Sequence, residues 1–400
     1  MLNTPSQSTT PSVCLMQPID PRGTKVGGLE TYIRDFLKFY PEGWKILLIG
    51  IDERGDLEPG KIIDLTLRSR TFAFMPIMHY PPEEQHEAAK KLSRSITFQF
   101  VLALFARFFS IRKLLRAGRY TVDLRRVEMS AFVYLTGRPF VQMLHGEGAP
   151  RMAMDSLIRK LRFTHNMAES FAMRHCWRFL CVNPQLADRL RATYPKYASK
   201  IGYVGTWADT SALSATPFPP TDRLEMVFVG RLDAFKDPAL MFDTLAELAR
   251  RGVAFRFNYI GTSDPDRFSE FDRIRAHTTL HGFQDRAGLD RIMSSMHMGL
   301  LFSHFEGMPR AVLEALACGR PVVTSDLYQL KGLVEIGVNG LIVPQRDASK
   351  LADGIITVFE RIKEGAYRPE TIRESMLDYT PEKQLSKVFT IHGNLAAAGV

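Results

Sequence analysis

Two glutamates stand eight residues apart in the segment FEGMPRAVLEALACGRPVV, at Glu306 and Glu314. The apolar run at 298–303 is short enough for a buried strand, and Pro309 stands where a helix would begin. Glu306 is therefore expected in the loop at the carboxyl end of a strand, with Glu314 on the following helix. Ligands of open parallel sheets bind at that edge. Carboxylates placed there can accept hydrogen bonds from the hydroxyl groups of a polyol.

A solvated helix face is the ordinary explanation for two glutamates at this spacing. In this helix, however, Leu313, Leu316 and Ala317 leave little polar surface. Glu314 is therefore not obviously exposed to water, and the context favours a binding role for the pair.

Two cations follow another apolar strand, in the segment VGRLDAFKD at 229–237. The strand ends at Gly230, and Arg231 and Lys236 come directly after it. Two cations at the carboxyl end of a strand can neutralise a diphosphate. Taken alone, they could be surface charges at a domain edge. Together with the glutamate pair in the same half of the chain, they favour a ligand site.

The segment from Glu306 onward resembles the signature of retaining glycosyltransferases of family 4, which have the GT-B fold. In that signature a glutamate, seven residues and a second glutamate precede Ala-x-Ala-x-Gly-x-Pro-Val-Val, and all of it is present here. The resemblance implies that Glu306 contacts hydroxyls of the donor sugar and Glu314 the ribose of the sugar nucleotide. It implies that Arg231 and Lys236 bind the donor diphosphate and stabilise it as it leaves. The expected donor site also includes Gly230, Gly307, Met308 and Pro309.

The first half of the chain contributes two weaker candidates. The loop at 23–32 follows the first strand, and a Gly-Gly pair there lets the backbone approach a ligand, although such pairs are most often turns. The resembling family has a Gly-Gly-x-Glu loop beside the diphosphate and acceptor, matched here by Gly27, Gly28 and Glu30. A lone histidine such as His145, at the end of a strand, is more often a core residue. In the family, a histidine after this strand contacts the transferred sugar.

One element departs from the family pattern. At the end of the first domain the family commonly shows Asn-Gly-Val-Asp, whereas the matching stretch here is GYVGTWAD at 202–209. Only Asp209 corresponds, and Thr206 and Trp207 take other positions of the element. The donor sugar is therefore not inferred from this stretch.

Short apolar strands alternate with amphipathic helices twice along the chain, which predicts two α/β domains. The resemblance implies the GT-B arrangement, in which two Rossmann-like parallel-sheet domains face each other across a cleft. We expect an acceptor-binding domain at 1–209, a proline-rich linker at 210–222 and a nucleotide-sugar-binding domain at 223–379. A last helix at 380–400 is expected to cross back to the first domain.

Composition narrows the class of protein. The 400 residues are 45% hydrophobic and 24% charged, as in an ordinary globular protein. The four cysteines lack metal-ligand spacing, so neither a metal site nor a cofactor beyond the sugar-nucleotide co-substrate is expected. The N-terminal sequence has neither the charged start nor the apolar core of a secretory signal. A reduced, cytoplasmic protein is the simplest interpretation.

The net charge of +9 is concentrated in the first half, where residues 1–210 hold 30 Lys and Arg against 19 Asp and Glu. The apolar run at 96–111 has basic residues on both sides and is shorter than the roughly 20 residues that cross a bilayer. It predicts an amphipathic helix that lies either at a membrane interface or in the core. No RNA- or DNA-binding motif is found, and no nucleic acid partner is expected. We expect peripheral binding to the inner face of the cell membrane.

These features together predict a metal-independent retaining glycosyltransferase. It would move a hexose from a nucleotide-diphosphate sugar to a lipid-linked or saccharide acceptor during synthesis of a surface polysaccharide, such as exopolysaccharide, capsule or lipopolysaccharide. Two alternatives stay open. A GT-B sugar-nucleotide epimerase would act without an acceptor, and a sugar-nucleotide-binding protein on the same scaffold would not be catalytic.

Overall fold

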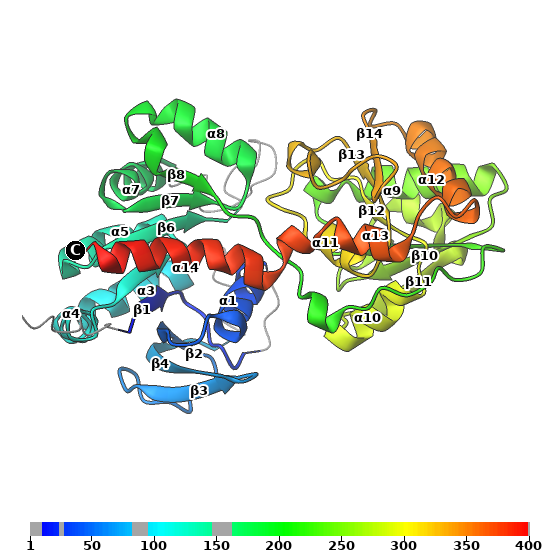
Figure 1. The fold of residues 1–400 in the computed structure, drawn as a ribbon. Coiled ribbons are helices and arrows are strands. Elements are labelled where there is room, and N and C mark those ends of the chain that lie inside the picture. The colour runs from blue at the N-terminus through cyan, green and yellow to red at the C-terminus, as the bar shows by residue number, and fades with distance from the viewer. Residues whose placement is uncertain (1–9, 24–27, 82–94, 146–161, 399–400) are drawn as a thin grey trace, which may run out of the picture. The chain divides into compact units, whose positions relative to one another are not determined.

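The computed structural model describes residues 10–23, 28–81, 95–145 and 162–398. They form two compact units, each with its own mainly parallel sheet (Figure 1). The first unit contains the described residues up to Val204 and resumes at Pro381, and the second unit is Gly205–Thr380.

The first unit contains an eight-stranded sheet in the order β3-β4-β2-β1-β5-β6-β7-β8. Neighbouring strands are parallel except β3 and β4, which form an antiparallel pair at one edge. All residues of β1, β5 and β6 are buried, as is typical of the central strands of a parallel sheet covered on both faces. The strands are β1 Ser12–Met16, β2 Lys45–Asp52, β3 Ile63–Leu67, β4 Arg70–His79, β5 Thr121–Leu124, β6 Phe140–Leu144, β7 Arg178–Cys181 and β8 Ile201–Tyr203.

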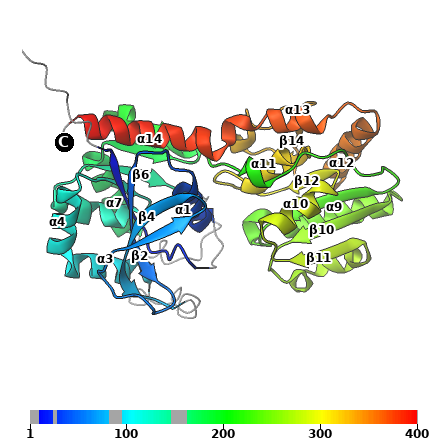
Figure 2. The same cartoon turned by 60° about the horizontal axis from the view of Figure 1, so that its bottom comes forward.

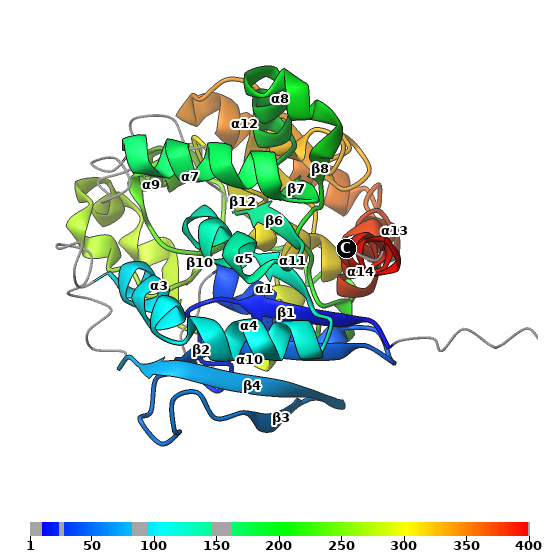
Figure 3. The same cartoon turned by 90° about the vertical axis from the view of Figure 1, so that its left-hand side faces the viewer.

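Helices cover this sheet in groups. Helices α3, α4, α5 and α7 contact one another in succession and lie on the side turned to the viewer in Figure 3. Helix α1 packs with the C-terminal helix α14, where Phe389 meets the rings of Phe36 and Trp44 at 4.9 and 4.8 Å. The helices are α1 Gly28–Phe39, α3 Ile96–Ala106, α4 Phe108–Ala117, α5 Ser130–Thr136, α7 Arg162–His175, α8 Pro184–Thr193 and α14 Pro381–Ala397.

The second unit contains a six-stranded parallel sheet in the order β11-β10-β9-β12-β13-β14. Helices α9 and α12 pack together, and α11 packs on β12, β13 and α13 (Figure 2). The strands are β9 Leu224–Val229, β10 Phe255–Ile260, β11 Thr278–Gly282, β12 Met298–Leu301, β13 Val322–Ser325 and β14 Gly340–Val343. The helices are α9 Pro238–Arg250, α10 Arg286–Ser294, α11 Arg310–Ala317, α12 Ala348–Lys363 and α13 Pro369–Glu374.

The prediction of two α/β domains with parallel sheets is confirmed. The strand that was expected to end at Gly230 ends at Val229, and the predicted strand at 298–303 exists but stops earlier, at Leu301. At the ends of these two strands the chain leaves the sheet and forms the loops that carry the candidate site. The analysis of the sequence did not identify the β3–β4 hairpin, whose burial alternates weakly along β3.

The apolar run at 96–111 differs from the single amphipathic helix that was expected. It is divided between α3 and α4 at Arg107, whose φ of −110° and ψ of 20° interrupt the helical backbone. Phe100 and Leu104 are buried in the core, whereas Phe98 and Leu102 are exposed. Helix α3 therefore has apolar side chains on both its buried and its exposed face. Among the described residues, no helix is long and apolar enough to cross a membrane.

Candidate functional site

The loops after β9 and β12 carry the charged residues predicted in the second half of the chain. The two strands are neighbours in the sheet and run parallel, so their carboxyl ends lie at the same edge. The chain winds away from them in opposite directions, to β10 on one side and β13 on the other. This is the topological switch point where ligands of open α/β sheets bind.

Lys236 and Glu306 meet at this point. Lys236 ends the short 3-10 helix Ala234–Lys236, and its Nζ lies 2.5 Å from Oε1 of Glu306. Oγ of Ser303 donates to the same oxygen at 2.6 Å. Both charged side chains are mostly buried, with 15% and 9% of their surface exposed. The pair can therefore present a cation and a carboxylate to a ligand from fixed positions.

Neighbouring contacts hold the two loops together. The backbone N–H of His304 donates to the carbonyl of Phe235 at 2.7 Å, which joins one loop to the other. Arg346 donates to the carbonyls of Phe302 and Ser303, each at 2.8 Å, and pairs with Asp237 at 2.5 Å. The sequence analysis missed Ser303 and Arg346. A serine in the Glu306 loop was a visible signal, whereas Arg346 follows a different strand and nothing local indicated it.

Arg231 is placed differently from Lys236. Its side chain is 72% exposed and makes one ion pair, to Asp233 at 3.0 Å. The preceding Gly230 has φ of 144°, a conformation that side chains rarely adopt, which explains the glycine where the chain turns out of β9. Arg231 therefore lies at the same strand end as Lys236, but its side chain stays largely exposed to solvent.

The helix after β12 has the predicted form. Pro309 is the N-cap of α11, Met308 is buried beside it, and Gly307 lies in the loop between Glu306 and Met308. Glu314 lies in α11, where its side chain is 13% exposed and 3.9 Å from Arg310. That low exposure contradicts the solvated-face explanation for Glu314.

In the first unit, His145 follows β6 and lies against buried groups. Nη1 of Arg125 is 3.1 Å from Nε2 of His145, and the ring of Tyr32 stands edge-on at 4.7 Å. Because a guanidinium only donates, Nε2 must accept and the ring proton is assigned to Nδ1. Burial and the Arg125 charge hold the pKa of His145 well below its usual range. His145 is thus a neutral imidazole that can donate from Nδ1.

Arg125 belongs to a buried network that reaches the C-terminal helix. Nε of Arg125 lies 2.6 Å from Oδ1 of Asp123, and both side chains are fully buried. Oδ2 of Asp123 lies 3.3 Å from Nε2 of His392 on α14, and Nδ1 of His392 lies 2.9 Å from Oγ1 of Thr121. Burial alone would raise the pKa of Asp123, but Arg125 and His392 outweigh it and lower that pKa. This network was not predicted from the sequence, because His392 is separated from Thr121, Asp123 and Arg125 by about 270 residues.

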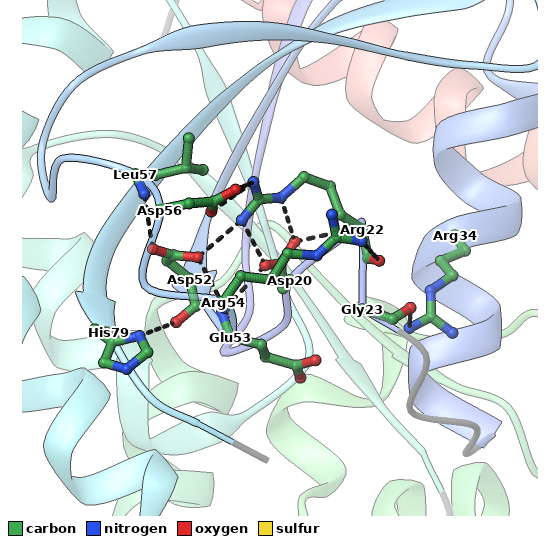
Figure 4. Close-up of polar contacts among 10 residues, drawn as sticks. All are labelled: Asp20, Arg22, Gly23, Arg34, Asp52, Glu53, Arg54, Asp56, Leu57 and His79. Carbon is green, nitrogen blue, oxygen red and sulfur yellow. Dashed lines mark hydrogen bonds and ion pairs between the residues drawn. The ribbon is translucent and has the colours of Figure 1, made fainter.

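The predicted Gly-Gly loop is described only in part. Gly27 lies outside the described residues, Gly28 is the first residue of α1, and Glu30 lies in the first turn of that helix. At the start of the loop, Arg22 pairs with Asp20 and Asp52, each at 2.8 Å (Figure 4). Arg22 therefore fastens the chain after β1 to the end of β2.

The stretch at 202–209, which departs from the family pattern, has a structural role. Trp207 is fully buried, and Thr206 is nearly so. Asp209 caps a short 3-10 helix and accepts from the backbone N–H and the hydroxyl of Ser211 at 3.1 and 2.6 Å. In the parts of the chain that the structure describes, no three His, Cys, Asp or Glu side chains are grouped as metal ligands.

Comparison with protein families matches residues 223–361 to the family "Glycosyl transferases group 1". Alpha-D-kanosaminyltransferase of Streptomyces kanamyceticus is 26% identical over 239 residues, 55% of this chain and 61% of that protein. The putative colanic acid biosynthesis glycosyltransferase WcaL of Salmonella typhimurium is 31% identical over 139 residues, 32% of this chain and 34% of that protein. The matches thus span about one to two thirds of the length of these relatives.

Solved structures resemble nearly the whole chain. Sucrose-phosphate synthase from Thermosynechococcus elongatus matches with a TM-score of 0.73 and 18% identity, covering 97% of this chain and 100% of that chain. HepE of Anabaena, solved in complex with UDP-glucose, matches with a TM-score of 0.63 and 14% identity, covering 97% and 99%. With its two α/β units and parallel sheets, the chain has the GT-B fold, and its second unit carries the segment that matches glycosyl transferases group 1.

Proposed function

We propose that the protein is a retaining glycosyltransferase that uses a nucleotide-diphosphate sugar. The observation that carries this proposal is the pairing of Lys236 with Glu306 beside Arg231 at the carboxyl ends of β9 and β12. This edge combines cations suited to a diphosphate with a carboxylate suited to hydroxyl groups. The match of 223–361 to glycosyl transferases group 1 and the UDP-glucose complex of the Anabaena neighbour support the proposal.

The donor would be bound by the second unit. Arg231 and Lys236 contact the diphosphate, Glu306 accepts from hydroxyls of a hexose, and Glu314 accepts from the ribose. Gly230, Gly307, Met308 and Pro309 bring the backbone close to the donor. The family resemblance would give His145 of the first unit, which can donate from Nδ1, a hydroxyl of the transferred sugar, and would give the Gly-Gly loop the diphosphate.

Transfer would proceed on the face from which the diphosphate leaves. The bond from the anomeric carbon to the diphosphate oxygen breaks, and the acceptor oxygen forms its bond on the same face. The acceptor proton passes to a phosphate oxygen of the leaving group. Arg231 and Lys236 stabilise the charge that develops on that group and take the role that a metal ion has in other transferases.

The acceptor would be a lipid-linked anion or a saccharide at the inner face of the cell membrane, in synthesis of a surface polysaccharide. The excess of basic residues in the first half supports an anionic acceptor. Exposed apolar side chains beside cations of α4 support contact with a membrane. They are Phe98, Leu102, Phe105 and Phe109, with Arg112, Lys113 and Arg116. WcaL, named for colanic acid biosynthesis, supports a role in polysaccharide assembly.

Thermal-shift screening against UDP- and GDP-sugars, followed by transfer assays with the stabilising donor, tests the proposal. We expect one class of sugar nucleotide to raise Tm in the wild type and to raise it less in Arg231→Ala. A donor that is converted without any acceptor would instead support the epimerase, and binding without turnover would support a non-catalytic protein.

A further inference from the structure

A cavity of about 590 Å³ lies at the amino-terminal ends of β6 and β7 in the first unit. It is at the opposite end of β6 from His145, which follows the carboxyl end of that strand. Three cations line it, Arg138, Arg178 and Lys200, and its lining includes no acidic residue. The cavity is therefore separate from the groups assigned to sugar transfer.

The three cations have only neutral partners. Nε of Arg138 donates to the carbonyl of Tyr120 at 2.8 Å. Nη1 of Arg178 donates to the carbonyl of Ser199 at 2.5 Å, and Nζ of Lys200 donates to the carbonyls of residues 174 and 176 at 3.0 and 2.9 Å. In the described ranges, none of the three pairs with a carboxylate within 4 Å. Hydrogen bonds to carbonyl groups hold the three cations in place, but no carboxylate of the described residues balances their charge.

A fourth cation adds to this charge. The Arg116 guanidinium lies against Gly137, another residue of the lining, and its Nε donates to the carbonyl of Thr136 at 3.0 Å. Burial and the nearby charges of Arg116 and Arg119 lower the pKa of Arg138, as expected where cations gather without acids. The cavity is thus a basic site built from several elements.

Aromatic rings form the rest of the wall. Tyr134 on α5 lies 4.3 Å from the ring of His175 on α7, and Trp177 stands beside them with 40% of its surface exposed. Exposed rings next to cations suit a ligand with an anionic group and a carbon body. We propose that this cavity binds a phosphate ester, with Arg138, Arg178 and Lys200 around the phosphate and the rings of Tyr134 and Trp177 against the carbon body.

Such an ester could belong to a lipid headgroup or to a free metabolite. Helices α3, α4, α5 and α7 lie in one layer, and they and the turn between α7 and β7 carry nine of the fifteen exposed large apolar side chains found in the described residues. These nine are Phe98, Leu102, Phe105, Phe109, Tyr134, Leu135, Phe163, Met167 and Trp177. Tyr134 of α5 and His175 of α7, two helices of this layer, line the cavity, which makes a lipid headgroup a chemically suitable source.

Titration of Trp177 fluorescence tests the proposal with two probes. Glycerol 3-phosphate represents the free ester, and phosphatidylcholine vesicles with or without phosphatidic acid represent the lipid. We expect a saturable change with at least one probe, weakened at least fivefold in Arg138→Gln and Arg178→Gln and abolished by high salt. Binding only to vesicles with phosphatidic acid identifies a lipid headgroup, and binding of glycerol 3-phosphate identifies a soluble ester.

Matched variants separate this site from general charge and from the donor site. Arg174→Gln changes an exposed cation outside the lining and should bind as the wild type does. Arg231→Ala should also bind normally, because the cavity does not use the donor site, so failure of the proposed transferase function would leave this result intact. If Arg138→Gln unfolds, binding by Arg178→Gln tests the proposal instead, because the side chain of Arg178 is exposed. No change with either probe, or equal weakening in Arg174→Gln or Arg231→Ala, would overturn the proposal.

Discussion

The charged residues of the two units are used in opposite ways. In the second unit, Arg231 is 72% exposed and pairs with its near neighbour Asp233, and Lys236 and Glu306 lie at the edge of the sheet. In the first unit, Arg125 and Asp123 pair with each other and are fully buried, and their further partners His145 and His392 come from other parts of the chain. The first arrangement leaves charge for a ligand, and the second holds one neutral imidazole in place.

Energetics separates the two arrangements further. An exposed ion pair such as that of Arg231 stabilises a protein by only about 0–1 kcal/mol. Stability therefore does not explain a cation at that strand end, whereas the proposed binding of an anion would. A buried pair stabilises the fold only while both partners are present, because removal of one leaves an uncompensated charge. Loss of Arg231 should thus affect turnover, and loss of Asp123 should affect folding.

The largest expected effect is that of Asp123→Ala. It leaves Arg125 charged and buried and removes a partner of His392, so we expect a loss of about 3–5 kcal/mol in the free energy of unfolding. Urea denaturation followed by circular dichroism measures the change. Asp243→Ala, at a half-exposed carboxylate of the second unit, is the control and should stay within about 0.5 kcal/mol of the wild type. A loss below about 1 kcal/mol for Asp123→Ala would contradict the contrast between structural charges in the first unit and ligand-binding charges in the second.

Arg231→Ala should lower kcat/KM by about 10²–10³ and leave Tm almost unchanged. One charge-assisted contact to a leaving group accounts for roughly 2–4 kcal/mol of transition-state stabilisation. Lys236→Ala should lower turnover as much but should also destabilise the fold, because Glu306 loses its buried partner. Lys350→Ala, an exposed cation of α12, serves as the control. Near-normal turnover by a folded Arg231→Ala variant would show that Arg231 does not belong to the proposed donor site.

Binding to anionic vesicles should depend on the first unit. Anionic headgroups attract surface cations at roughly 1 kcal/mol each, so changing Arg112, Lys113 and Arg116 to glutamate should weaken co-sedimentation at least tenfold. The same charge change at Arg291, Lys350 and Lys363 of the second unit should have little effect. Salt should weaken binding. Equal binding to neutral and anionic vesicles, or binding to neither, would count against a membrane role for this face.

A smaller effect concerns the pH dependence of stability. Because the folded protein holds the pKa of His145 well below 6.5, the unfolded chain binds a proton that the folded chain does not as pH falls below about 6.5. That proton should lower the free energy of unfolding by about 1 kcal/mol between pH 6.5 and 5.5. His145→Asn should remove this part of the slope, which urea titrations at several pH values would detect. An unchanged slope would show that folding does not lower the pKa of His145.

The smallest expected effect is that of a chelator. Since Arg231 and Lys236 are proposed to take the cation role, EDTA should leave the rate of transfer within error of the untreated rate. Activity that disappears with EDTA and returns with magnesium or manganese would contradict this assignment.

The sequence by itself determined the strand ends and the helix start that carry the proposed donor site. Apolar runs, Gly230 and Pro309 located the ends of β9 and β12 and the start of α11, because strand burial and turn geometry depend on nearby residues. The spacing of Glu306 and Glu314 and the cations at 231 and 236 then indicated the chemistry. The sequence did not predict the helix break at Arg107, since an arginine in a helical run carries no strong signal for one.

Only the tertiary structure decided which of these residues meet. Lys236 and Glu306 are 70 residues apart, and they touch because β12 lies beside β9 in the sheet, an order that the spacing of strands along the chain does not fix. The same holds for Arg125 and His145, which follow the neighbouring strands β5 and β6, and for His392, which α14 brings to Asp123. Local propensity sets the elements, whereas burial of their apolar faces against one another sets the order in which they assemble.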